Sequence, residues 1–359
     1  MRADRHCALV RAVQTNCHIA DAGHAADLSL CIYLLQMREM FRWEQGMAFT
    51  DELDRQAVGP WLARREALWA EIESQPWAPL PIGGRLFDAL DVEAVNAELA
   101  PLGLVYGAGL AASDRPTCFL ATLDELRQRD EGLRLQVCGR EYARGLFAPP
   151  AALVGDRTIM LRRESLARWL WEKFEAFSLR RAEGPMKAFA EAYALHDKAD
   201  FVATLPRLVD DLGESLVLHE VGEYRAGQWL GPDWAAMRLA LEPRRTDLRV
   251  RAVRDHIADL EVTLPTLVEG GQGAALHFWF ATYEGLREQL FPSLACGYAA
   301  WRDGDAGKAL LYAARTGAEH FRALASQVLG LHRCLGRQAG PAIEQLLSSA
   351  QAVCTLPGR

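Results

Sequence analysis

The spacing of hydrophobic and polar positions changes twice along the chain, near residues 75 and 162. Residues 25–45 are apolar on nearly every side of a helix, which predicts a buried helix with charges in its last turns. Residues 50–74 predict a more polar helix, broken near Pro60 because proline removes a helical hydrogen bond. The prolines and glycines of residues 75–84 cannot continue a helix, so a subdomain boundary is expected there.

The second region has short apolar runs with turn residues between them, a pattern that predicts a small sheet. A short helix is expected after Gly139. The strands are expected at residues 103–109, 117–123, 133–138 and 157–161.

The third region has a helical period almost to the end of the chain, and proline or glycine marks most of its breaks. Helices are expected at residues 164–182, 185–197, 206–230, 244–265, 272–290, 305–332 and 338–352. Strands confined to one insertion and helices elsewhere indicate an α+β fold, predominantly a helical bundle with a small inserted sheet.

This pattern predicts three parts. Residues 1–75 form N-terminal helices that pack on the bundle, and residues 76–162 form a small α+β subdomain with short strands. Residues 163–359 form the helical bundle domain that carries the candidate site.

Composition narrows the class of protein. Half of the 359 residues are hydrophobic, enough for one large core or two ordinary ones. The net charge of -7 disfavours nucleic-acid binding, and no stretch is long and apolar enough to cross a membrane. Eight cysteines without a C-x-x-C pair are typical of reduced thiols in the cytoplasm. A homo-oligomer is left open.

The motif with the clearest chemistry is His219-Glu220-Val221-Gly222-Glu223. It reads H-E-x-x-E, whereas the zinc-binding helix of metallopeptidases reads H-E-x-x-H. On a helix His219 and Glu223 lie one above the other on an apolar side, where an imidazole and a carboxylate need a partner or a metal ion. They are the first two candidate metal ligands, and Glu220 is the candidate general base.

Further ligands are expected from neighbouring helices, as in helical-bundle metal sites. Asp255 and Asp259 lie four residues apart on a stripe that is partly apolar, so either they contribute ligands or they face water. We take Asp255 as a third candidate ligand. The carboxylate-rich set favours iron or manganese as much as zinc.

Charged residues also end the most apolar helix. Glu39 is a further candidate metal ligand, and Arg38 and Arg42 are candidate substrate-binding residues because guanidinium groups suit carboxylates and phosphates. The alternative is a local ion pair between Glu39 and Arg42.

Several ordered blocks resemble an uncharacterised prokaryotic family of similar length with no assigned activity. The blocks span residues 16–22, 28–44, 103–109, 138–141 and 218–223. The resemblance covers most of the chain and implies one co-folding unit, but it implies no function.

Two functional hypotheses follow. The first is a metal-dependent enzyme that uses iron, manganese or zinc in oxygen-dependent or hydrolytic chemistry on a small molecule. The second is a non-catalytic helical scaffold or partner-binding protein, in which the same residues form a buried His/Glu network.

Overall fold

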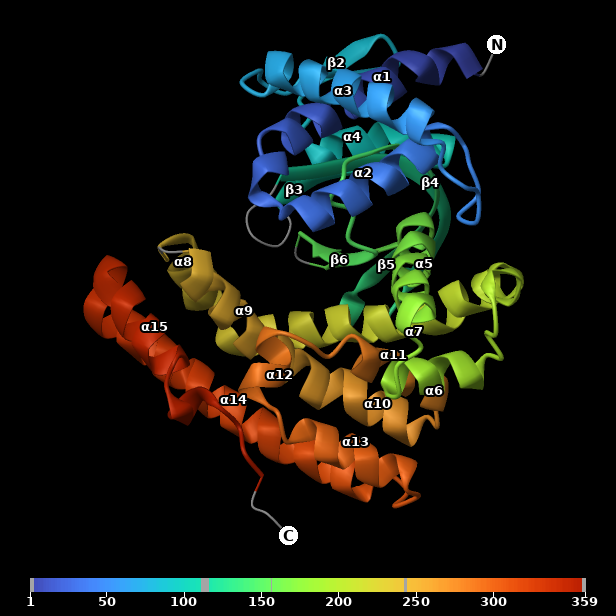
Figure 1. The fold of residues 1–359 in the computed structure, drawn as a ribbon. Coiled ribbons are helices and arrows are strands. Elements are labelled where there is room, and N and C mark those ends of the chain that lie inside the picture. The colour runs from blue at the N-terminus through green and yellow to red at the C-terminus, as the bar shows by residue number, and fades with distance from the viewer. Residues whose placement is uncertain (1–2, 111–115, 156, 242–243, 357–359) are drawn as a thin grey trace. The chain divides into compact units, whose positions relative to one another are not determined.

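The computed structural model describes residues 3–110, 116–155, 157–241 and 244–356. These residues form a mostly helical α+β fold with a small sheet, which confirms the predicted fold class (Figure 1). The chain divides into two compact units. Residues 1–152 and 160–172 form the N-terminal unit, and residues 153–159 and 173–359 form the C-terminal unit.

The N-terminal unit contains four helices and most of the strands. The helices are α1 (Ala3–Ala22), α2 (Leu30–Glu44), α3 (Arg55–Ile72) and α4 (Val92–Leu99). The strands are β1 (Leu80–Ile82), β2 (Arg85–Phe87), β3 (Leu104–Leu110), β4 (Pro116–Gln128), β5 (Arg134–Arg144), β6 (Ala151–Val154) and β7 (Thr158–Arg162).

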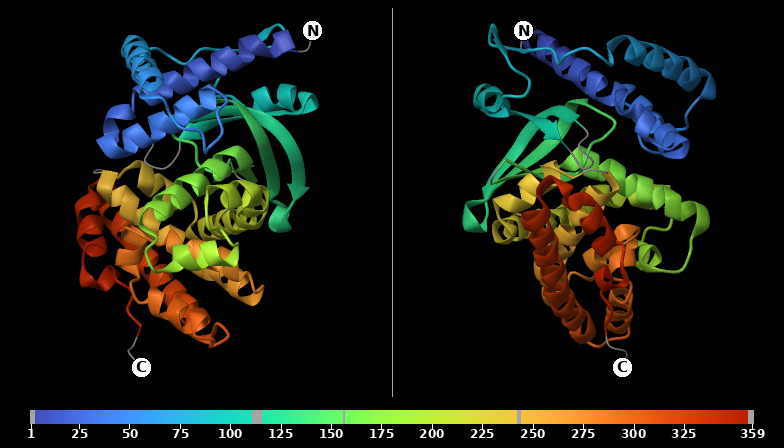
Figure 2. Two further views of the ribbon diagram at one scale, coloured as in Figure 1. Left: turned by 45° about the vertical axis from the view of Figure 1, so that its right-hand side comes forward. Right: turned by 90° about the vertical axis from the view of Figure 1, so that its left-hand side faces the viewer.

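Strands β1 and β2 form a hairpin, and the other five form a sheet in the order β3-β4-β5-β7-β6. Strands β4 and β5 are long, antiparallel and curved, and their register shifts between Leu120 and Glu125 (Figure 2). The short helix expected after Gly139 is wrong, because β5 continues through this residue to Arg144. Asp124 lies so close to Gly139 that a side chain there would collide with its carboxylate.

Helix α1 belongs to the region of residues 1–75 for which N-terminal helices are predicted. Every fourth residue places Leu9, Val13 and Cys17 on one buried face of it. This face packs with residues of α4, β3 and β4 in one core of the unit. A second core lies among α2, α3 and the end of α1. Helix α3 passes through Pro60, so the break expected there is wrong.

The apolar start of α2 is not buried as its composition predicts. Leu30, Ile32, Leu34 and Leu35 are between 47% and 70% exposed, whereas Met37, Met40 and Phe41 further along are buried. The charged end of the helix is therefore its buried end. This reversal brings Glu39 and Arg42 into the interior of the N-terminal unit.

Helix α5 (Arg163–Arg180) begins in the first unit and ends in the second. Apart from the ends of β6 and β7 that fall within residues 153–159, the regular elements of the C-terminal unit are helices. Its helices are α6 (Pro185–Ala192), α7 (Lys198–Leu230), α8 (Pro232–Leu239), α9 (Arg244–Ala258), α10 (Leu264–Glu269), α11 (Gly273–Ala281), α12 (Leu286–Leu290), α13 (Leu294–Arg302), α14 (Lys308–Leu335) and α15 (Gly340–Leu347). Helix α9 packs against both α7 and α14 (Figure 1).

Several elements of this unit differ from the sequence prediction. The helix expected at 272–290 is two helices, α11 and α12, and α8 and α13 lie where no helix was expected. Helix α7 begins at Lys198 rather than near residue 206, because Asp197 caps it by accepting a hydrogen bond from the Asp200 backbone N–H. The helix expected at 244–265 is α9 followed by a π-helical turn, Asp259–Thr263. Within the described residues, no helix combines the length and the apolar composition needed to span a bilayer.

Candidate metal centre

Helix α7 carries the H-E-x-x-E motif on the face that the sequence predicts. The residues of the apolar stripe are all buried: Leu208, Leu212, Ser215, Ala226 and Leu230. His219 and Glu223 lie on the same stripe, and their side chains are 25% and 15% exposed. Both side chains are therefore partly buried but still accessible to solvent.

Gly222 determines how close α9 comes to this motif. A Cβ atom at Gly222 would lie 2.5 Å from the backbone oxygen of Ala258, so only glycine lets the two helices touch here. The contact places the last turn of α9 beside His219. Asp255 and Asp259 follow on this turn and on the π-helical turn after it.

The π-helical turn directs Asp259 toward α7. Pro265, near the start of α10, has no N–H to donate to the carbonyl of Glu261, a condition that favours a widened turn. Asp259 is 1% exposed, and its Oδ1 lies 2.7 Å from Nδ1 of His219. Its Oδ2 lies 3.4 Å from Nη1 of Arg287.

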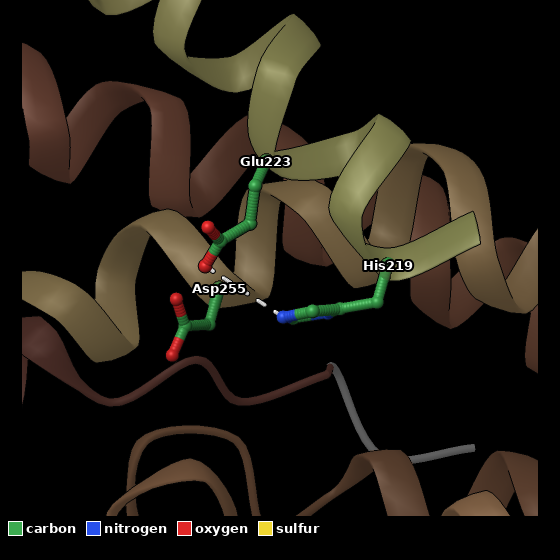
Figure 3. A group of neighbouring side chains, drawn as sticks. All are labelled: His219, Glu223 and Asp255. Atoms are coloured by element: carbon green, nitrogen blue, oxygen red, sulfur yellow. Dashed lines mark ion pairs between the residues drawn. The ribbon is translucent and has the colours of Figure 1, made fainter. Parts of the chain in front are cut away.

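His219, Glu223 and Asp255 converge from two helices (Figure 3). One ligand atom from each of the three lies within 4.8 Å of the others, a spacing that a single metal ion can bridge. Nε2 of His219 is 3.7 Å from Oε1 of Glu223. Because Nδ1 faces Asp259, Nε2 is the ring nitrogen that faces the other two carboxylates.

Arg254 is the main competitor for a cation at this position. Its Nη2 atom donates to Oε1 of Glu223 and lies 3.7 Å from Oδ1 of Asp255. The arginine therefore neutralises part of the charge of these two carboxylates.

Burial and nearby charges shift the pKa values of His219, Glu223 and Asp255. Burial opposes protonation of His219, but the charges and hydrogen bonds of Asp259 and Glu223 outweigh it and hold the His219 pKa well above its usual value. Burial would raise the Glu223 pKa, yet Arg254 and His219 lower it strongly. Burial and the charge of Glu223 raise the pKa of Asp255 to about 7.

Glu220, the candidate general base, is on the same helix but is not one of the three converging residues. Its side chain is buried, and Oε2 accepts a hydrogen bond of 2.7 Å from the backbone N–H of Leu153. Burial and the charge of Glu223 raise the Glu220 pKa to about 7. A carboxyl that changes protonation near neutrality is suited to proton transfer.

The remaining sequence candidates belong to the N-terminal unit. Oε1 of Glu39 accepts hydrogen bonds from Nη1 of Arg42 and from Nε of Arg38, so the local ion pair that we considered does form. The structure therefore brings together His219, Glu223 and Asp255 and leaves Glu39 outside this group.

Arg254 is not among the candidate residues that the sequence suggests. A signal was present: Arg254 follows Val250 by four residues and precedes Ile257 by three, which puts it on the buried stripe of α9. Arg287 had no comparable signal, since its approach to Asp259 depends on the π-helical turn.

Two family models match the chain. The N-terminal domain of a family of unknown function (DUF6866) matches residues 8–162, and the C-terminal domain of the same family matches residues 167–350. No curated protein and no solved structure matches. The resemblance to an uncharacterised family is thereby confirmed.

Proposed function

The chain belongs to DUF6866, a family of unknown function, and we propose that it is a metal-dependent enzyme acting on a small molecule. His219, Glu223 and Asp255 would hold one divalent ion of iron, manganese or zinc. The observation that carries the proposal is the convergence of these three side chains within 4.8 Å.

The support that Asp259 gives to His219 favours a metal over a simple polar network. Metal-bound histidines usually donate their second ring N–H to a carboxylate, which fixes the ring and increases its basicity. Asp259 occupies this position at 2.7 Å and is almost completely buried.

The charges of the cluster are also compatible with a divalent cation. The carboxylates are Glu220, Glu223, Asp255 and Asp259, and the fixed cations are Arg254 and Arg287. With a neutral imidazole at His219 and all four carboxylates ionised, the carboxylates exceed the two guanidinium groups by two charges. Without a metal, protons on His219, Asp255 and Glu220, whose pKa values are raised, offset this excess. One divalent ion would displace these protons and offset the same charge.

One nitrogen and two carboxylates form a hard ligand set, which suits iron and manganese at least as well as zinc. Three protein ligands leave positions open for water, oxygen or substrate. An iron ion would support oxygen-dependent chemistry, whereas a redox-inert ion would activate water for hydrolysis. In either case Glu220 would accept or donate the proton that the reaction transfers.

A non-catalytic scaffold with a buried His/Glu network is the second candidate. The ion pair between Arg254 and Glu223 supports it, because it partly satisfies the carboxylate without any metal. The two candidates differ in whether metal binding depends on His219.

The deciding experiment is elemental analysis by plasma mass spectrometry on protein purified without added metals or chelators. We expect near-stoichiometric iron, manganese or zinc in the wild type and its loss in His219→Ala. The matched control is His196→Ala, since His196 is exposed and lies outside the cluster. Circular dichroism would establish that each variant is folded.

Wild-type protein that remains metal-free after reconstitution with each of the three ions would overturn the proposal. Metal that persists at the same stoichiometry in folded His219→Ala would also overturn it. A metal-free wild type together with a destabilised His219→Ala would favour the scaffold.

A further inference from the structure

The N-terminal unit contains a cavity of about 750 Å³, separate from the residues of the metal centre. Its walls come from α1, α2, β5, the start of α5 and the segment after α2. Pockets of roughly 300–1,000 Å³ are the usual size for small-molecule ligands. The volume therefore fits a small organic molecule rather than a few water molecules.

Arginines are concentrated in and beside this cavity. Arg42, Arg144 and Arg168 line it and are each more than nine-tenths buried. Arg162 is equally buried but does not line the cavity, and its Nε donates to Oε1 of Glu141, which does. Full burial of a guanidinium group is rare unless an anion compensates it.

Carboxylates accompany these cations at the cavity. Of the four glutamates that line it, Glu39 and Glu141 are as buried as the arginines. Glu44 is engaged by Arg65 and by Trp61, which do not line the cavity. Oε2 of Glu164 accepts a hydrogen bond from the backbone N–H of Glu141. Arg168 also forms an ion pair of 3.8 Å with Glu172 on its own helix.

Three of the arginine donors at the cavity have no acceptor among the described residues. Nε of Arg42, Nε of Arg144 and Nη1 of Arg168 are buried and have no hydrogen-bond partner among the residues that the structure describes. A buried donor without an acceptor costs free energy, and oxyanions are the groups that guanidinium donors bind best.

The rest of the lining suits an anionic ligand with an apolar body. Trp43, Phe49 and Tyr142 contribute aromatic surface. Arg11 and Arg140 are exposed and also line the cavity, so they would attract an anion toward it.

We propose that this cavity binds a small dianion, a dicarboxylate or a phosphate monoester, whose oxyanions are held by Arg42, Arg144 and Arg168. The oxyanions would accept hydrogen bonds from the buried arginine donors that otherwise have no acceptor. Oε2 of Glu39 and Oε2 of Glu141 also have no hydrogen-bond partner among the described residues, and they would accept from a hydroxyl group of the same ligand.

The test is isothermal titration calorimetry of the full chain with succinate and with phenyl phosphate, and with uncharged succinamide as the ligand control. We expect binding of at least one dianion and none of succinamide. Tighter binding of phenyl phosphate would identify a phosphate ester as the ligand class, and tighter binding of succinate a dicarboxylate.

Arg168→Met and Arg144→Met keep most of the side-chain volume and remove one charge each. Each is expected to weaken dianion binding at least about tenfold, as expected for loss of a charge-assisted hydrogen bond. The control Arg64→Met changes an exposed arginine of the same unit that does not line the cavity, and it should bind as the wild type does.

Melting temperature with and without ligand gives a second readout. The dianion is expected to raise the melting temperature of the wild type, and Arg168→Met is expected to reduce this rise. Replacing a purely structural arginine would lower the melting temperature without ligand but leave the rise unchanged. A variant that melts below the wild type and binds the dianion equally well would overturn the proposal. So would the absence of binding by every dianion at millimolar concentration.

The proposal is independent of the metal centre. His219→Ala is expected to bind the dianion normally, and Arg168→Met is expected to retain metal, so failure of one proposal leaves the other standing.

Discussion

Nδ1 of His219 lies 2.7 Å from Oδ1 of Asp259, although the two residues are forty positions apart in the chain. The contact depends on two local features. Gly222 lets α9 approach α7, and the π-helical turn directs the Asp259 side chain into the contact. The orientation of the candidate metal ligand is thus determined by a neighbouring helix.

Replacing Asp259 by asparagine should weaken metal binding while leaving all three proposed ligands in place. Asp259→Asn is expected to lower metal affinity about 10- to 100-fold, because the imidazole loses the carboxylate that orients it. Metal titration followed by calorimetry measures the change. Asp233→Asn, at an exposed aspartate paired with Arg333, is the matched control. Equal affinities in the two variants would contradict a supporting role for Asp259.

The glycines of α7 provide a test of the helix contact. Gly222→Ala is expected to destabilise the protein by about 1–3 kcal/mol, because the new methyl group would overlap the backbone of Ala258. Gly227 is on the same helix with nothing within 4 Å of its Cβ position. Gly227→Ala should instead stabilise by about 0.5–1 kcal/mol, because alanine is the better helix former.

Chemical denaturation of the two variants measures both effects. Gly222→Ala should also lose metal, since Asp255 and Asp259 would move with α9. Equal stability of the two variants would show that α7 and α9 are further apart than the structure has them.

A buried aspartate in the N-terminal unit should make stability depend on pH. Burial raises the pKa of Asp21 to about 8, despite its hydrogen bond from the Leu146 N–H and the charge of Arg65. Above about pH 4 the unfolded chain loses this proton and the folded protein keeps it, so stability falls as pH rises toward the folded pKa.

Asp21→Asn retains an acceptor for Leu146 and removes the titration. Between about pH 5 and pH 7, the wild type should lose about 1.4 kcal/mol per pH unit relative to this variant. Urea denaturation at several pH values measures the difference. Asp130→Asn, at an exposed residue, should follow the wild type, and parallel curves for all three proteins would be incompatible with a proton held at Asp21.

The thiols should react in two groups. Cys7, Cys31, Cys296 and Cys334 are exposed, whereas Cys17, Cys118, Cys138 and Cys354 are buried. Burial raises the pKa of Cys138 to about 12 and that of Cys354 to about 11, so little thiolate forms at neutral pH.

A disulfide-exchange reagent is therefore expected to modify four cysteines rapidly in the native protein and the other four after denaturation. Mass spectrometry of the labelled peptides identifies them. The sharpest single check is Cys17, whose Sγ lies 2.9 Å from that of Cys118 in the interior. Rapid native labelling of Cys17 would mean that α1 does not pack on the sheet as described.

The sequence predicted those features that depend on local periodicity. The stripe from Leu208 to Leu230 and the alignment of His219 with Glu223 follow from the helical period alone. The same reasoning misjudged α2, because periodicity reports which side chains are apolar and not which surface of the fold is available to cover them. The charged end of α2 is buried because compensating groups are present there.

The missing parts of the candidate site depend on contacts between distant segments. Asp255 and Asp259 are equivalent candidates in the sequence, because they lie on one stripe of the helix. In the structure, Asp255 joins the converging ligands and Asp259 contacts the ring of His219. Their roles separate only when α7 and α9 are packed at Gly222. The arginines of the cavity are equally scattered in the sequence, since Arg42 and Arg168 come from helices far apart along the chain.

The π-helical turn has an evolutionary consequence. A turn of this kind is equivalent to one extra residue inserted into a continuous helix, and deleting it would rotate the side chains on one side of it by about 100° relative to the other. A family member without that residue would hold the side chains of α9 and those of α10 in a different relative phase. Insertions and deletions at residues 259–263 should therefore occur together with changes in the side chains of α7 and α14 that this segment packs against, so that natural gaps report on this packing as directly as substitutions do.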